Sequence, residues 1–138
     1  MNRKLARELC MKILFEMLMN KEYNIEILDN YLSSDEREDS QGQYVHTVIS
    51  SSIQHIEEVN GLIKKYAIGW TLDRIAKVDL AILQLAVIEI LHMEDIPYNV
   101  SINEAVELAK KYSSDESTSF INGILGKFVE KEGIKKHD

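Results

Sequence analysis

The chain has 138 residues, which suits one domain large enough to fold around its own core without disulfides or a metal. Its single cysteine, Cys10, cannot form an internal disulfide and indicates a reducing, cytoplasmic setting. No uncharged run approaches the roughly 18 apolar residues of a membrane span, and charged side chains near the N-terminus argue against a signal peptide.

The net charge of −7 argues against a nucleic-acid partner until its distribution is considered. Residues 16–60 hold 10 acidic and 2 basic residues, a net charge of −8. The first twelve residues have a net charge of +3, because they contain one acidic residue, Glu8, and four basic ones: Arg3, Lys4, Arg7 and Lys12. The N-terminal segment can therefore present a local anion site on an acidic protein.

Helical periodicity runs through almost the whole chain, and no alternating apolar pattern indicates strands, so an all-α fold is predicted. The first helix is expected over residues 3–19 and the second over residues 24–32. Residues 33–43 contain no apolar side chain and are predicted to form a loop. A long helix, or a broken pair weakened near Gly61, is expected over residues 43–67.

The central helix, expected over residues 73–93, is the most apolar segment. From residue 76 to residue 92, 12 of 17 residues are aliphatic, so the other helices must pack around it. Pro97 prevents its simple continuation. Ser101 and Glu104 have the spacing of a capping box and predict the start of the next helix.

The first helix carries a second apolar strip opposite its core stripe. Lys4, Met11, Phe15 and Met19 lie within about 60° of one another on the helical wheel, and Arg7 borders them. Exposed apolar strips mark partner surfaces, and methionine suits adaptable ones. The alternative is that another helix covers the strip, and spacing alone favours neither interpretation.

Asp79 is unusual because its neighbours on the helical wheel are aliphatic. An unpaired buried carboxylate is too unfavourable to keep. It is therefore either paired within the chain, with Arg74 or Lys77 as candidates, or exposed at an edge where a partner docks.

The segment Phe120-Ile121-Asn122-Gly123 falls early in the last helix, which is expected over residues 116–131. Asn-Gly normally signals a hairpin turn, yet no strand flanks it. One explanation is a small residue that allows close approach of another helix. The other is an exposed aromatic ring and an amide that stack on and hydrogen-bond an unstacked RNA base.

Residues suited to catalysis are sparse, so no enzyme is predicted. Glu89 and His92 form one Glu-x-x-His half-motif, whereas a di-iron site needs two. Cys10 lies on the core stripe, where a thiol is inert. No metal and no cofactor are predicted, because ligand spacing to His92 is absent at the other histidines: His46, His55 and His137.

Together these residues resemble the NusB family of bacterial transcription antitermination factors. The resemblance is looser over residues 6–15 and essentially absent over residues 20–43. It is close over four stretches, which are Trp70-x-Leu-Asp-Arg-Ile-Ala-x-Val-Asp-x-Ala-Ile-Leu, Asp95-Ile-Pro, Val100-Ser-Ile-Asn-Glu-Ala-Val-Glu-Leu-Ala-Lys and Phe120-Ile-Asn-Gly-Ile-Leu.

The resemblance implies about seven helices in two packed helical-bundle subdomains, residues 1–67 and 68–138, around an apolar central helix. It implies no catalytic activity. It also implies binding of boxA-type single-stranded RNA together with the small-subunit ribosomal protein NusE. The assembly would help an elongating RNA polymerase resist termination in ribosomal RNA operons. A homodimer is compatible with the resemblance.

The family's RNA contacts match Arg3, Lys4, Arg7, Phe120 and Asn122 of this sequence. The partner surface matches Phe15 and Asp79, to which the strip adds Met11 and Met19. The chain departs from the family where Leu5 occupies a position that can be basic and Lys4 one where arginine is common. Lysine lacks the planar fork that binds phosphate. Weaker RNA binding alone, and greater dependence on the partner, are expected.

Two other classes of function remain open on the residues alone. One is a self-associating helical module that uses the strip of Met11, Phe15 and Met19 and binds no RNA. The other is a metal-dependent enzyme centred on Glu89 and His92.

Overall fold

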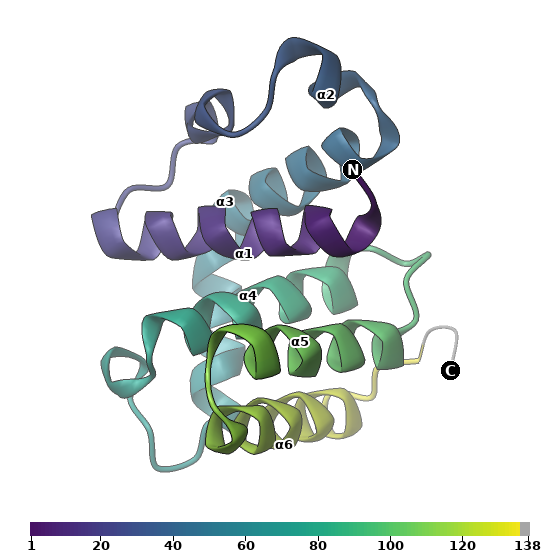
Figure 1. Ribbon diagram of the computed structural model, residues 1–138. Helices are drawn as coiled ribbons and strands as arrows, with labels where there is room; N and C mark the ends of the chain where they lie inside the picture. The colour runs from purple at the N-terminus through teal and green to yellow at the C-terminus, as the bar shows by residue number, and fades with distance from the viewer. Residues whose placement is uncertain (136–138) are drawn as a thin grey trace.

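The computed structural model describes residues 1–135, so His137 lies outside the described residues. This part of the chain forms six α-helices and two 3₁₀-helices without strands, which confirms the all-α class (Figure 1). No described helix is long and apolar enough to span a membrane. The elements are α1 (Arg3–Asn20), η1 (Ile25–Asn30), α2 (Ser34–Glu38), α3 (Ser40–Tyr66), η2 (Leu72–Arg74), α4 (Lys77–His92), α5 (Tyr98–Tyr112) and α6 (Asp115–Lys131).

The helix α4 is the centre of the fold, as its composition predicts. It contacts α1, α3, α5 and α6, and every residue from Asp79 to Ile90 is buried. In Figure 1, α1, α4, α5 and α6 lie one below another while α3 passes behind them. Each fully buried leucine or isoleucine of α4 contributes about 1.5–3 kcal/mol to folding.

The segment between α1 and α3 differs from the prediction. The expected helix at residues 24–32 is the 3₁₀-helix η1, and the expected loop at residues 33–43 contains α2 and the start of α3. Ser33 and Glu36 form a capping box at α2, and Asp39 caps α3 by accepting from the Gly42 amide. These capping bonds satisfy helix ends within a polar stretch, which hydrophobic periodicity does not detect.

The predicted capping box at Ser101 is wrong. The helix α5 begins at Tyr98, with Pro97 at its N-cap, so Ser101 lies within the helix. Its hydroxyl donates instead to Oε1 of Glu89 on α4, at 2.8 Å. Proline suits the beginning of a helix because its fixed φ is already helical and its missing N–H is not needed there.

The long helix α3 is bent at His55, whose φ of −117° and ψ of 19° are not helical. The weak point expected at Gly61 lies one turn and a half further on, within regular helix. One turn before the bend, the buried Ser52 hydroxyl donates to the carbonyl of Val48 at 2.7 Å. Such back-bonding by serine bends helices.

Candidate RNA and protein interfaces

The apolar strip of α1 lines an open groove of about 480 Å³. Met11 is buried at its base, Phe15 is half-buried, and Met19 is 56% exposed. Tyr31, directly after η1, and Tyr112 at the end of α5 flank the strip without covering it. We call this surface the Phe15 groove; its lining residues are Met11, Lys12, Phe15, Glu16, Met19, Tyr31, Val78 and Tyr112.

Asp79 directly follows Val78, which lines the Phe15 groove, but Asp79 itself does not line that groove. Its carboxylate is 5% exposed and accepts hydrogen bonds from the hydroxyls of Ser113 at 2.7 Å and Ser117 at 2.6 Å. Among the residues that the structure describes, neither Arg74 nor Lys77 forms an ion pair with it. Two neutral hydroxyls therefore hold this carboxylate, and neither of the two candidate cations of the paired alternative does.

A second hollow, of about 350 Å³, opens beside Asp79. Phe120 lines it and packs edge-to-face on Trp70, with ring centroids 5.5 Å apart. The structure thus places a predicted RNA contact beside a predicted partner contact. We call this surface the Asp79 hollow; its lining residues are Trp70, Arg74, Ile75, Ala76, Asp79, Glu116, Ser117 and Phe120.

Asn122 and Gly123 are exposed on α6. Asn122 lies about 200° around the helix from Phe120, so the two side chains do not form one platform. A Cβ atom placed on Gly123 would meet no atom within 4 Å. Close approach of another helix therefore does not explain the glycine.

The basic residues at the start of α1 are held in different ways. The Arg3 guanidinium lies 4.1 Å from the centre of the Tyr44 ring, and its Nε donates to Gln41 Oε1 at 2.7 Å. Lys4 is 70% exposed, with its Nζ 3.3 Å from Glu104 Oε2. The first turn of α1 has no acidic residue, so the positive end of the helix dipole is not neutralised there.

Arg7 lies inside the protein, 5% exposed. Its Nε and Nη2 donate to the two carboxylate oxygens of Glu89, at 2.7 and 3.2 Å, and the Tyr44 hydroxyl also donates to Glu89. Burial alone would lower the pKa of Arg7, but the bonds to Glu89 outweigh it and the pKa is raised. Burial and the Glu89 charge raise the pKa of Tyr44. Arg7 is thus the buried cation of a network and does not offer a free guanidinium to phosphate.

A groove of about 380 Å³ between α1 and α5 contains two cations that sequence reasoning missed, Lys110 and Lys111. Each is paired, Lys110 with Glu107 at 3.4 Å and Lys111 with Glu8 at 3.0 Å. Counting Lys4, Arg7 and Glu104, four basic and three acidic residues line this α1–α5 groove, so its formal charge is +1. Lys110 and Lys111 are adjacent basic residues in the last turn of α5, and this pair was the signal in the sequence that could have pointed to the groove.

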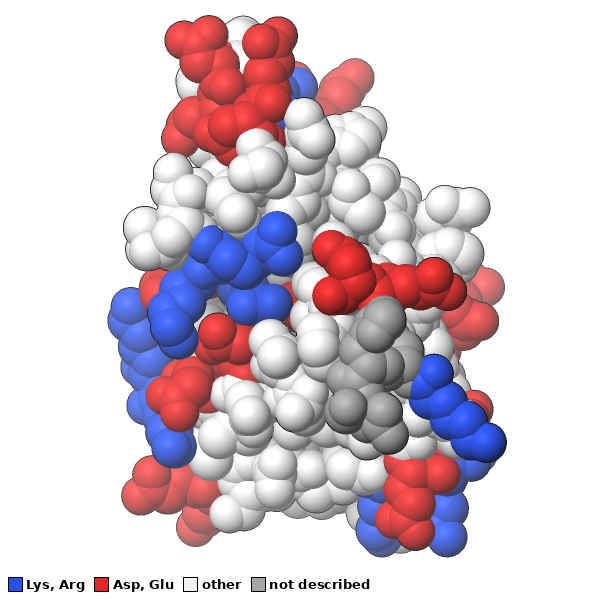
Figure 2. Space-filling view, turned by 90° about the vertical axis from the view of Figure 1, so that its right-hand side faces the viewer, with Lys and Arg blue, Asp and Glu red and all other residues white. Residues whose placement is uncertain are grey.

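Figure 2 shows how charge is distributed around this end of the molecule. Acidic side chains gather at the top, over the region of α2, and basic side chains lie lower, beside further acidic ones. The mixture agrees with the paired cations of the α1–α5 groove. An anionic ligand therefore meets a weakly positive surface next to a repulsive one.

The Glu-x-x-His half-motif does not form one site. Glu89 turns into the Arg7 network, whereas His92 lies against His55, with ring centroids 4.2 Å apart. His55 has no ligand spacing to His92 in the sequence, yet the fold stacks these two rings although they are far apart in the chain. Burial raises the pKa of the Cys10 thiol well above its ordinary value, which keeps the thiol protonated.

Comparison with known proteins gives consistent matches over nearly the whole chain. The NusB family model matches residues 4–130. The transcription antitermination protein NusB of Alkaliphilus oremlandii is 54% identical over 134 residues, which cover 97% of both chains. The protein of the same name from Acetivibrio thermocellus is 46% identical and covers 94% of this chain and 89% of its own.

Solved structures agree in fold. T. maritima NusB superposes with a TM-score of 0.87 at 30% identity, covering 95% of this chain and 92% of its own. A structure of the antitermination factors NusB and NusE in complex with dsRNA superposes with a TM-score of 0.76 at 24% identity, covering 94% of this chain and 96% of that one. At this level of identity the second match supports the fold alone.

Proposed function

The chain belongs to the NusB family, and on that premise we propose that it is a transcription antitermination factor without catalytic activity. It binds boxA-type single-stranded RNA together with the ribosomal protein NusE, and this assembly helps RNA polymerase resist termination in ribosomal RNA operons. Support comes from curated relatives named transcription antitermination protein NusB, which match along almost the full length of the chain.

The observation that carries the proposal is the open Phe15 groove together with Asp79, whose carboxylate is held by serine hydroxyls and by no cation within residues 1–135. The Phe15 groove, with Met19 exposed, offers area for hydrophobic burial, and Asp79 offers a negative charge in the Asp79 hollow. A complementary partner surface would carry an apolar anchor for the groove and a lysine or arginine for Asp79. Such a pairing of a central anchor with a desolvated charge is typical of specific protein interfaces.

The RNA surface begins at Arg3 and Lys4, where the helix dipole of α1 favours a phosphate. It continues along the α1–α5 groove, which supplies Lys110 and Lys111, and Asn122, exposed on α6, is a further proposed contact. Phosphates compete there with carboxylates already paired to the lysines. Binding of RNA alone is therefore weak, and NusE is needed to supply further contacts.

The salt dependence of RNA binding tests this surface. Wild-type protein titrated with a boxA oligonucleotide in the presence of NusE should give a log–log salt slope near −2 for about three neutralised phosphates. Lys4→Ala should weaken binding and make the slope shallower by roughly 0.7, whereas Lys64→Ala, an exposed lysine at the end of α3, should change neither. Equal effects of the two variants, or no binding at low salt, would contradict the proposal.

A further inference from the structure

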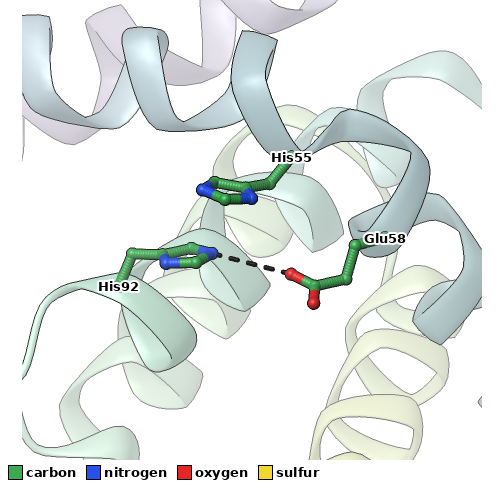
Figure 3. A group of neighbouring side chains, drawn as sticks. All are labelled: His55, Glu58 and His92. Atoms are coloured by element: carbon green, nitrogen blue, oxygen red, sulfur yellow. Dashed lines mark ion pairs between the residues drawn. The ribbon is translucent and has the colours of Figure 1, made fainter.

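Three side chains outside the proposed interfaces meet where α3 bends and α4 ends. His55 and Glu58 come from one face of α3, and His92 is the last residue of α4. One nitrogen of each histidine and one Glu58 oxygen all lie within 4.8 Å of one another. The two imidazole rings are nearly parallel, at 15°, and the Glu58 carboxylate points toward the His92 ring (Figure 3).

The His92 side chain is incompletely satisfied in this cluster. Its Nε2 is buried and has no hydrogen-bond partner among residues 1–135. Its ion-pair partner, Oε1 of Glu58, is 3.7 Å away, which is too long for a hydrogen bond. A buried nitrogen without a partner is unfavourable, so a ligand that fills the space between these atoms would be stabilised.

The bend in α3 creates this juxtaposition. His55 is the one residue of α3 with non-helical backbone angles, and no proline or glycine adjoins it. The bend brings its ring over His92, while Glu58 reaches the same point from the next turn. Glu58 is 59% exposed, so the cluster is open to solvent on one side.

We propose that His55, Glu58 and His92 bind one divalent transition-metal ion, with Zn²⁺ as the ion that this donor set favours. Two imidazole nitrogens with one carboxylate oxygen are a common three-ligand set for zinc, which leaves a fourth position for water. Imidazole ligands select zinc and its neighbours over magnesium and calcium, which prefer oxygen. Burial and the adjacent His55 lower the pKa of His92, which keeps the neutral, ligating form available near neutral pH.

Metal binding requires a small, defined rearrangement. In a tetrahedral site with metal–ligand bonds of about 2.05 Å, the ligand atoms lie about 3.3 Å apart. The two imidazole nitrogens and the Glu58 oxygen now lie within 4.8 Å of one another, so they must approach one another by at most roughly 1.5 Å. The rings tilt out of their parallel stack, because a metal lies in the plane of each imidazole. The ion then links the bend of α3 to the end of α4. Asp79 lies at the opposite end of α4, and the three proposed ligands line neither the Phe15 groove, the Asp79 hollow nor the α1–α5 groove.

Calorimetric titration of the metal-free full chain with ZnCl₂ tests the site. Wild-type protein should bind one Zn²⁺ per chain, and a hundredfold excess over the dissociation constant should raise the Tm by about 10 °C. His55→Gln and His92→Gln should abolish this binding. Glu58→Gln, at an exposed position that does not support the fold, should weaken it at least about tenfold.

His46→Gln is the matched control, because His46 is an exposed histidine on the same helix. It should leave the stoichiometry, the affinity and the Tm shift unchanged. Circular dichroism of the variants without metal separates loss of binding from loss of fold. Full zinc binding by folded His92→Gln or Glu58→Gln protein, or an equal loss in His46→Gln, would overturn the proposal in favour of adventitious surface binding.

Discussion

Glu89 and Asp79 are both buried carboxylates of α4, yet the protein holds them in different ways. Glu89 is 1% exposed and accepts from Arg7, Tyr44 and Ser101. Asp79 is 5% exposed and accepts from two serine hydroxyls. Glu89 lies within the helix bundle, whereas Asp79 lies beside a hollow that opens to the surface.

The comparison shows which buried charge is scaffold and which is available to a partner. A buried ion pair such as Arg7–Glu89 is satisfied within the fold, and its removal damages the protein rather than a binding surface. Hydroxyls stabilise the Asp79 charge without neutralising it. An incoming lysine or arginine can therefore still gain from contact with Asp79.

The largest expected effect follows from breaking the Glu89 network. Arg7→Ala leaves a buried, uncompensated carboxylate and should lower the free energy of unfolding by about 3–5 kcal/mol, measured by urea denaturation. Arg37→Ala, which removes an exposed ion pair with Asp29 on the surface, should lower it by less than about 1 kcal/mol. Similar small losses in both variants would show that the Arg7 network is not scaffold.

A smaller effect concerns Glu8, a carboxylate held by a tyrosine hydroxyl and a lysine near the surface. The Tyr112 hydroxyl, then Lys111, lowers the pKa of Glu8 below its ordinary value of 4.5. The folded state therefore holds this proton less tightly than the unfolded state. The stability that Glu8 contributes is present above pH 4.5 and is lost as the pH falls from there through the lowered pKa.

Tyr112→Phe removes the main cause of the Glu8 shift, so unfolding stability should fall less steeply below pH 4.5 than in wild type. Thermal unfolding over a pH series measures this slope. Tyr23→Phe serves as the control, because burial alone raises the pKa of Tyr23 and no carboxylate is involved. An acid slope identical in wild type and Tyr112→Phe would exclude the proposed link.

The sequence predicted the elements whose signals are local and repeated. The apolar run of α4, the last helix α6 and the strip on α1 each follow from helical spacing, and the structure has all three. Ser101 and Glu104 have the residue types and spacing of a capping box, which led to the wrong helix start. The helix begins one turn earlier, directly after Pro97. The polar α2 was missed because its caps, rather than a buried face, define it.

Contacts between residues far apart in the chain could not be predicted from helical spacing. Arg7 reads as a surface cation on a helical wheel, and its pairing with Glu89, 82 residues away, exists only in the fold. The His55–His92 stack depends on the bend in α3, which no proline or glycine announces. Phe120 and Asp79 were assigned to different surfaces, yet they share one hollow.

The most direct test of this account is the affinity of NusE for Asp79→Asn protein, measured by calorimetry and compared with wild type. Asp95→Asn is the control, because it changes an exposed carboxylate just beyond the other end of α4. We predict at least about 30-fold weaker NusE binding for Asp79→Asn, unchanged binding for Asp95→Asn, and unchanged binding of boxA RNA alone in both. NusE affinity equal to wild type in a folded Asp79→Asn protein would contradict the assignment of Asp79 as the charge that the fold leaves for its partner.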